Sequence, residues 1–83
     1  MKILYFGWVK SKIGIGGETI DLPPDVKIVS DLITFLCSRG PSHESALGNI
    51  SQIRVAVDQE IGTVDTPISK AEEVALFPPM TGG

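Results

Sequence analysis

The side chains that most often carry out chemistry in proteins are scarce in this chain of 83 residues. It has one histidine, His43, and one cysteine, Cys37. Structural zinc takes four ligands and catalytic zinc takes three, so we expect no metal site. No nucleophile signature surrounds the histidine, so we expect no nucleophile–base pair. We interpret His43 as a solvated residue of a polar loop and Cys37 as a small, inert hydrophobe on a helix.

Two further patterns resemble sites but have simpler explanations. Glu72 and Glu73 are adjacent carboxylates in an expected turn, where such a pair is usually a solvated charge run. Gly14, Gly16 and Gly17 spell Gly-x-Gly-Gly. We expect no helix after these glycines and no Lys-Ser/Thr pair closes them, so hairpin geometry explains them better than a phosphate-binding loop.

The remaining candidate is the C-terminal segment, residues 78–83, with the sequence Pro-Pro-Met-Thr-Gly-Gly. Two prolines cannot donate to a sheet ladder and favour an extended backbone, so the chain must leave the sheet after Phe77. At roughly 3.3–3.6 Å per residue, the segment reaches about 20 Å. Gly82 and Gly83 have no side chains, so they can thread a narrow channel and present the terminal carboxylate to another enzyme. A terminal Gly-Gly often marks only a frayed chain end. Here the stiff Pro-Pro spacer before it favours a tail that is inserted into a partner protein.

Length and charge narrow the possible partners. A chain of 83 residues is one domain with a thin core. The net charge is −3, and the seven Lys and Arg form no basic stripe, so we expect neither nucleic acid nor a membrane surface as a partner. A protein with a basic surface fits better. The apolar run 3–6 is too short for a signal peptide or a membrane span, and a single cysteine forms no internal disulfide. We therefore expect a cytoplasmic protein.

Apolar alternation and turn residues predict five strands around one main helix. The expected strands are 2–8, 18–22, 53–57, 60–64 and 74–77, with turns at 11–17 and 58–59. The helix is expected to begin at an N-cap, Ser30, with Asp31 in its first turn, and to stop at Gly40-Pro41. Its apolar stripe consists of Val29, Leu32, Ile33, Leu36 and Cys37. We expect residues 42–51 to be irregular, with at most a short helical turn near Ala46.

These elements predict an α+β fold in which the first and last strands are central neighbours and the helix covers one face. The opposite face is expected to be open, so an apolar side chain such as Phe77 there would mark a partner surface. We divide the chain into a domain of residues 1–77 and an extended tail of residues 78–83.

Nearly the whole chain resembles the small subunits of molybdopterin synthase, sulfur carriers of the ubiquitin-like β-grasp class. The run Leu4–Gly7, the turn glycine Gly14, the helix positions Val29, Leu32 and Leu36, and the strand Val55–Val57 follow the family pattern. The strongest match is Glu73–Gly83, because Pro-Pro-x-Thr-Gly-Gly is far more specific than a bare Gly-Gly. The chain departs from the family at Lys10-Ser11, at Asp58 and at 70–73, which puts details of the partner surfaces in doubt.

The resemblance implies a mixed sheet of four to five strands with one main helix, and a non-catalytic, sulfur-donating subunit of a sulfurtransferase in molybdenum cofactor biosynthesis. An E1-like adenylyltransferase uses ATP to adenylate Gly83, and a sulfur donor protein then yields a thiocarboxylate. The large subunit receives the tail and transfers the sulfur to precursor Z, cyclic pyranopterin monophosphate. A heterotetramer with a large-subunit dimer is also implied, with no bound cofactor. Gly83 and Gly82 are the reacting end, and the partner-binding residues are Phe77, Pro78, Pro79, Met80 and Thr81.

Three alternatives remain open. The chain could be a β-grasp sulfur carrier for thiamine or for tRNA thiolation. It could be a ubiquitin-like modifier whose terminal glycine forms an isopeptide with a lysine. It could also be a non-covalent binding module that acts through the open sheet face and does not use its tail.

Overall fold

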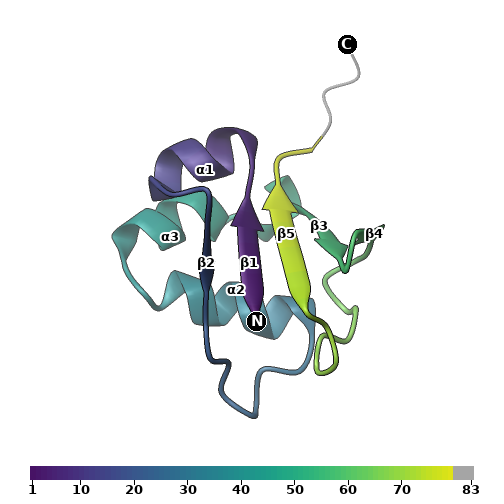
Figure 1. Ribbon diagram of the computed structural model, residues 1–83. Helices are drawn as coiled ribbons and strands as arrows, with labels where there is room; N and C mark the ends of the chain where they lie inside the picture. Colours follow the sequence, from purple (N-terminus) through teal and green to yellow (C-terminus); the bar gives the residue numbers. More distant parts are fainter. Residues whose placement is uncertain (80–83) are drawn as a thin grey trace.

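The computed structural model describes residues 1–79. Five strands form one mixed sheet in the order β2-β1-β5-β3-β4 (Figure 1). Their bounds are β1 Lys2–Tyr5, β2 Gly17–Thr19, β3 Arg54–Val57, β4 Glu60–Ile61 and β5 Glu73–Phe77. β1 and β5 pair in parallel at the centre, and the other neighbours are antiparallel. The predicted α+β class and the central position of the first and last strands are therefore confirmed.

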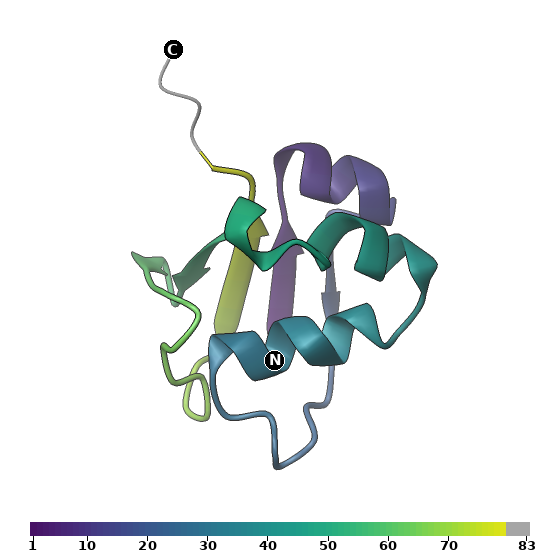
Figure 2. The same ribbon diagram turned by 180° about the vertical axis from the view of Figure 1, so that it is seen from behind.

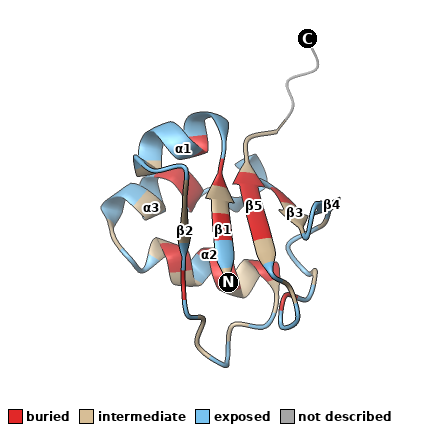
Figure 3. Cartoon of the chain, in the orientation of Figure 1, coloured by how far each residue is buried: buried red, intermediate tan, exposed pale blue. Residues whose placement is uncertain are grey.

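In the view from behind, α2 crosses in front of the central strands, and α3 and η1 lie on the same side of the sheet (Figure 2). The bounds of the helices are α1 Gly7–Ile13, α2 Val29–Cys37, α3 Pro41–Leu47 and a 3₁₀ turn, η1, Ile50–Gln52. The predicted stripe is confirmed, because Val29, Leu32, Ile33 and Leu36 are buried and Cys37 packs beside them. They form one buried cluster with Ile3, Tyr5, Val74 and Leu76, alternate residues of the central strands. Figure 3 shows the buried stretches of β1, β5 and α2 in red.

The prediction that Ser30 caps α2 is wrong by two residues. The cap is Ile28, whose backbone is extended. The carboxylate of Asp31 accepts hydrogen bonds from the backbone N–H groups of Lys27 and Ile28, at 3.1 and 3.2 Å. Asp31, in the first turn, therefore provides the side-chain capping that was expected of Ser30. Its negative charge also lies at the positive end of the helix dipole.

The predicted first strand is too long, and a helix was missed. β1 ends at Tyr5 and α1 occupies Gly7–Ile13, because Gly7 takes a left-handed backbone angle of φ +58° that ends the strand. Val9 and Ile13 face the core one turn apart. Gly14 is the C-cap of this helix, at φ +96°, and its N–H donates to the carbonyl of Lys10. The glycines after Ile13 therefore end a helix rather than make a hairpin.

Three other boundaries also differ from the prediction. Gly40-Pro41 ends α2 as expected, but Pro41 also begins α3, where its missing N–H is harmless. The segment expected to be irregular thus contains a helix, and Ala46 and Leu47 are buried in the core. The strand predicted at 18–22 is β2, Gly17–Thr19, and the one predicted at 60–64 ends at Ile61.

The hairpin turn at 58–59 is confirmed. Asp58 and Gln59 have positive φ angles of 49° and 71°, as a two-residue turn matched to the strand twist requires. The Asp58 carboxylate also accepts hydrogen bonds from the N–H groups of Glu72 and Glu73, both at 2.9 Å. Asp58 thus secures the start of β5, and with it the strand that leads to the tail.

Candidate functional site at the base of the tail

The predicted site lies at the end of β5, where the chain leaves the sheet. Phe77, Pro78 and Pro79 are half-buried there. Met80, Thr81, Gly82 and Gly83 lie outside the described residues. The structure therefore describes how the base of the predicted tail is held, and the reacting end remains a prediction from the sequence.

The start of α1 packs against the base of the tail. The N–H of Phe6 donates to the carbonyl of Leu76 at 3.1 Å, which extends the β1–β5 pairing by one bond. A Cβ atom at Gly7 would lie 2.7 Å from Cγ and 2.9 Å from Cδ of Pro78. Such distances essentially never occur, so only glycine lets the ring of Pro78 lie this close. The direction in which the chain leaves β5 is thus set by contact with α1.

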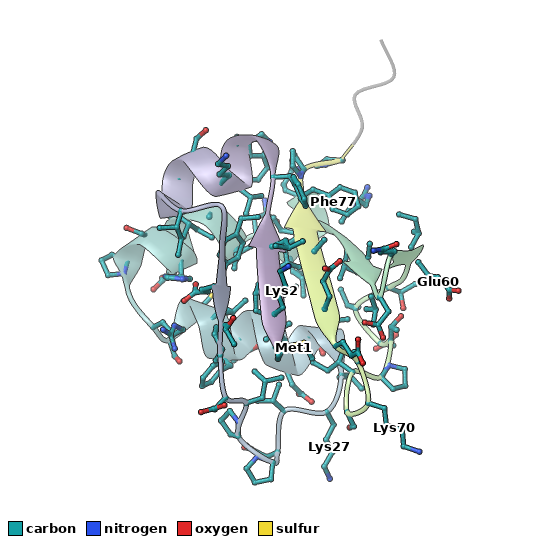
Figure 4. The ribbon with its side chains drawn as sticks, in the orientation of Figure 1. Met1, Lys2, Lys27, Glu60, Lys70 and Phe77 are labelled. Carbon is teal, nitrogen blue, oxygen red and sulfur yellow. The ribbon has the colours of Figure 1, made fainter. Side chains whose placement is uncertain are left out.

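The sheet face opposite the helices carries a row of apolar and small residues across all five strands. By register the row runs Gly17, Leu4, Ala75, Ala56, Ile61. The side chain of Ile61 is 77% exposed. Phe77 lies two residues beyond Ala75 on the same strand, opposite Arg54, and marks the tail end of this face (Figure 4). In this row Leu4 and Ala56 are half-buried and Ala75 is buried, so Ile61 and the half-buried Phe77 are the apolar side chains that a partner would meet most readily.

A second cluster, which sequence reasoning missed, surrounds Glu18. Its Oε2 accepts a 2.7 Å hydrogen bond from the hydroxyl of Tyr5 and lies 2.8 Å from Nε2 of His43. Its Oε1 lies 3.3 Å from the guanidinium of Arg39. The prediction that His43 is a solvated loop residue is therefore wrong, because α3 brings it to the edge of β2 and into edge-on contact with the ring of Tyr5. The sequence signal for α3 is the apolar pair Ala46 and Leu47, which are the buried residues of this helix.

Opposing effects act on the Glu18 carboxyl. Burial raises its pKa, but the hydrogen bonds from His43 and Tyr5 and the charges of His43 and Arg39 outweigh burial, so the pKa of Glu18 is lowered. Burial raises the pKa of Tyr5, and its hydrogen bond to Glu18 raises it further. The cluster joins β1 and β2 to the α2–α3 connection and to α3, so it is a structural cross-link.

The thiol of Cys37 is half-buried against the core, as predicted. Burial raises its pKa, and the nearby charge of Glu44 adds to this. A raised pKa means little thiolate at neutral pH, so Cys37 is a poor nucleophile. In residues 1–79, no three His, Cys, Asp or Glu side chains come close enough to bind a metal ion. Across the same residues, no helix is long and apolar enough to cross a membrane.

The geometry thus describes a domain in which Pro78 and Pro79 leave the sheet next to Gly7 and to the row of apolar and small residues. Comparison with known protein families identifies the family of this domain. The model of the ThiS family matches residues 3–83. This chain belongs to the ThiS family. Family membership confirms the resemblance that the sequence motifs indicated.

Two relatives and one solved structure illustrate the likeness. The molybdopterin synthase sulfur carrier subunit of Dictyostelium discoideum is 35% identical over 99% of this chain and 94% of its own length. The protein of the same name from Mycosarcoma maydis is 32% identical over 100% of this chain and 92% of its own. SAMP1, the small archaeal modifier protein 1 of Haloferax volcanii, superposes with a TM-score of 0.77 at 26% identity, over 100% and 98% of the two chains. The chain therefore has the β-grasp fold.

Proposed function

We propose that this ThiS-family chain is the sulfur carrier subunit of a molybdopterin synthase. An adenylyltransferase activates the terminal carboxylate of Gly83, a donor protein replaces the adenylate with sulfur, and the tail delivers this sulfur to precursor Z in the large subunit. The relatives named as sulfur carrier subunits support this proposal over 92% and 94% of their own length. The single observation that carries it furthest is the clamped tail base, where Gly7 fits the ring of Pro78.

The chemistry follows from the reactivity of a carboxylate. A carboxylate oxygen of Gly83 attacks the α-phosphorus of ATP, and pyrophosphate leaves, which gives a mixed anhydride with AMP. The terminal sulfur of a persulfide on the donor protein then attacks the acyl carbon, and AMP leaves with the electron pair of the broken C–O bond, which gives an acyl disulfide with the donor. A second thiol of the donor attacks the donor's own sulfur of that disulfide, so a donor disulfide forms and the S–S bond breaks to release the thiocarboxylate. The resulting thiocarboxylate sulfur is a covalently carried nucleophile. The base and the substrate pocket are supplied by the partners, which agrees with the raised pKa of Cys37 in this chain.

The domain contributes by position rather than by reactive side chains. A tail held at its base reaches a limited volume, so the carried sulfur enters the partner at high effective concentration. Phe77 and the open sheet face would then bind the large subunit while Pro78 and Pro79 lead into its active site. Met80 and Thr81 would line the entry, and Gly82 would keep the approach narrow.

The test is a reconstituted transfer reaction. The thiocarboxylated chain, the large subunit and precursor Z are mixed, and the dithiolene product is measured. We expect product in proportion to the carrier, and none from a chain that lacks Gly83. Undiminished product from the truncated chain would refute the proposal, and it would favour a role for the open face alone.

A second function is favoured by one observation, the similarity to a protein named as a modifier. In that case the adenylated Gly83 would be attacked by a lysine amine, and AMP would leave as an isopeptide forms. Incubation with ATP, the adenylyltransferase, a sulfur donor and a lysine-bearing acceptor distinguishes the two functions. Conjugates of higher mass would support the modifier, whereas a thiocarboxylate that persists without conjugates supports the carrier.

A further inference from the structure

A second apolar surface lies beside the start of β3, and its apolar lining residues are not those of the open-face row. It is a groove of about 500 Å³ that we call the β3-edge groove. Val29, Ile33 and Val55 line it, and each is at most 4% exposed. Ile50 and Val64 also line it and are 38% and 36% exposed, so apolar lips surround a buried floor.

The two sides of the β3-edge groove are fixed in place by backbone hydrogen bonds. On one side, the N–H of Gly62 donates to the carbonyl of Val55 at 3.0 Å, and the N–H of Ser30 donates to the carbonyl of Val64 at 2.8 Å. On the other side, the turn of η1 is closed by the N–H of Ile53, which donates to the carbonyl of Ile50 at 3.1 Å. The groove is therefore preformed, so binding of a ligand would cost little free energy for ordering the groove residues.

One cation stands at this groove. Arg54 is its only charged lining residue, and Nη1 of Arg54 donates to the carbonyl oxygens of Ser51 and Ile53, both at 3.3 Å. Among residues 1–79, no carboxylate lies within ion-pair distance of its guanidinium. In a chain of net charge −3, this arginine is held in position with donors to spare. A carboxylate is the group that its planar fork binds best.

We propose that the β3-edge groove binds an extended segment of a partner protein in which an apolar side chain stands beside a carboxylate. The apolar side chain covers the buried floor between Ile50 and Val64, and the carboxylate pairs with Arg54. Exposed apolar lips around a buried floor are typical of the pockets that hold the anchor residues of protein partners. Arg54 links the groove to the tail base, because it lines the groove and is directly opposite Phe77 in the β3–β5 pairing.

The partner's identity rests on the proposed function, but the chemistry of the groove does not, so a defined peptide tests it. The probe is acetyl-Gly-Asp-Leu-Ile-Gly-amide, titrated into the ¹⁵N-labelled full chain and followed by NMR. We expect saturable shifts of the amides of Arg54, Gly62 and Val64, with a Kd of about 1 mM, as suits one anchor and one ion pair. The Arg54→Gln variant should bind about fivefold more weakly. Lys70→Gln makes the same charge change away from the groove, at the loop before β5, and should leave the Kd unchanged (Figure 4).

Several results would overturn the inference. Groove amides that do not shift on titration would refute it, and so would a peptide with Lys in place of Asp that binds equally well. Shifts of these amides on removal of residues 80–83, without peptide, would identify the chain's own tail as the occupant. Shifts that grow with protein concentration would identify a second copy. If the peptide fails while Gly83 still forms a thiocarboxylate, the groove is refuted and the proposed function stands.

Discussion

The ring of Pro78 lies so close to Gly7 that a Cβ atom at position 7 would be 2.7 Å from Cγ of the proline. Gly7 also has a φ of +58°, a backbone conformation that side chains rarely adopt. One glycine therefore ends β1, starts α1 and sets the direction of the chain after β5. In a carrier whose function depends on where its tail points, this contact links the fold to the delivery of the carboxylate.

Replacing Gly7 with alanine should therefore do more than strain the backbone. We expect Gly7→Ala to lower the free energy of unfolding by about 1–3 kcal/mol, of which about 1 kcal/mol is the cost of the left-handed angle. It should also slow sulfur transfer, because Pro78 must move. Urea denaturation and the transfer rate are the two measurements.

The matched control is Gly14→Ala. Gly14 also has a positive φ, of +96°, but a Cβ atom there meets nothing within 4 Å. This variant should lose stability to a similar backbone cost and keep the transfer rate. If both variants transfer sulfur at the wild-type rate, the Gly7–Pro78 contact does not position the tail.

The tail end of the open face should determine the affinity for the large subunit. Phe77→Asp places a charge on an apolar surface beside the tail, so we expect binding to weaken about tenfold or more. Calorimetric titration with the large subunit measures it. Ile15→Asp changes another exposed apolar residue, in the loop after α1, and should bind normally. Unaltered binding by Phe77→Asp would mean that its side chain is only an edge of the fold.

The Glu18 cluster makes stability depend on pH. The folded-state pKa of Glu18 is lowered, so its contribution is fully present above its unfolded pKa of about 4.3 and is lost as pH falls through the folded value. We expect Glu18→Gln to cost about 1–2 kcal/mol at pH 6–7, and the difference from wild type to shrink below about pH 4. Urea melts across this range measure it, with the exposed Glu60→Gln as control. A difference that does not vary with pH would show that the charge of Glu18 is not used.

Cys37 should react slowly with iodoacetamide. Burial and the charge of Glu44 raise its pKa, so the thiolate fraction at pH 8 is smaller in the folded protein than in urea. Glu44→Gln should speed the folded-state reaction modestly, since it removes the smaller of the two causes. Mass spectrometry of the alkylated chain follows the rate. Equal rates for folded and unfolded protein would contradict the packing of this thiol.

The sheet and its main helix could be predicted because their signals are long and regular. The stripe from Val29 to Leu36 and the alternation in Arg54–Val57 each specify one buried face. The end of β5 at Phe77 could be predicted because Pro78 and Pro79 cannot donate to a sheet ladder; the tail beyond them stays a prediction. These features need no information about distant contacts.

The remainder depends on contacts that the sequence does not display. α1 has only seven residues, and its formation depends on Gly7 and on the burial of Val9 rather than on propensity. The Glu18 cluster joins residues 25 positions apart, and no local pattern connects His43 to Glu18. The same is true of the β3-edge groove, whose sides come from segments far apart in the chain.

The central claim is that Gly83 carries sulfur, and the intact mass of the chain tests it most directly. The chain is incubated with ATP, the adenylyltransferase and a sulfur donor, and then weighed by mass spectrometry. We predict a gain of about 16 Da, the replacement of one oxygen by sulfur, that depends on ATP and is absent when Gly83 is deleted. An unchanged mass with all three components active would contradict the account.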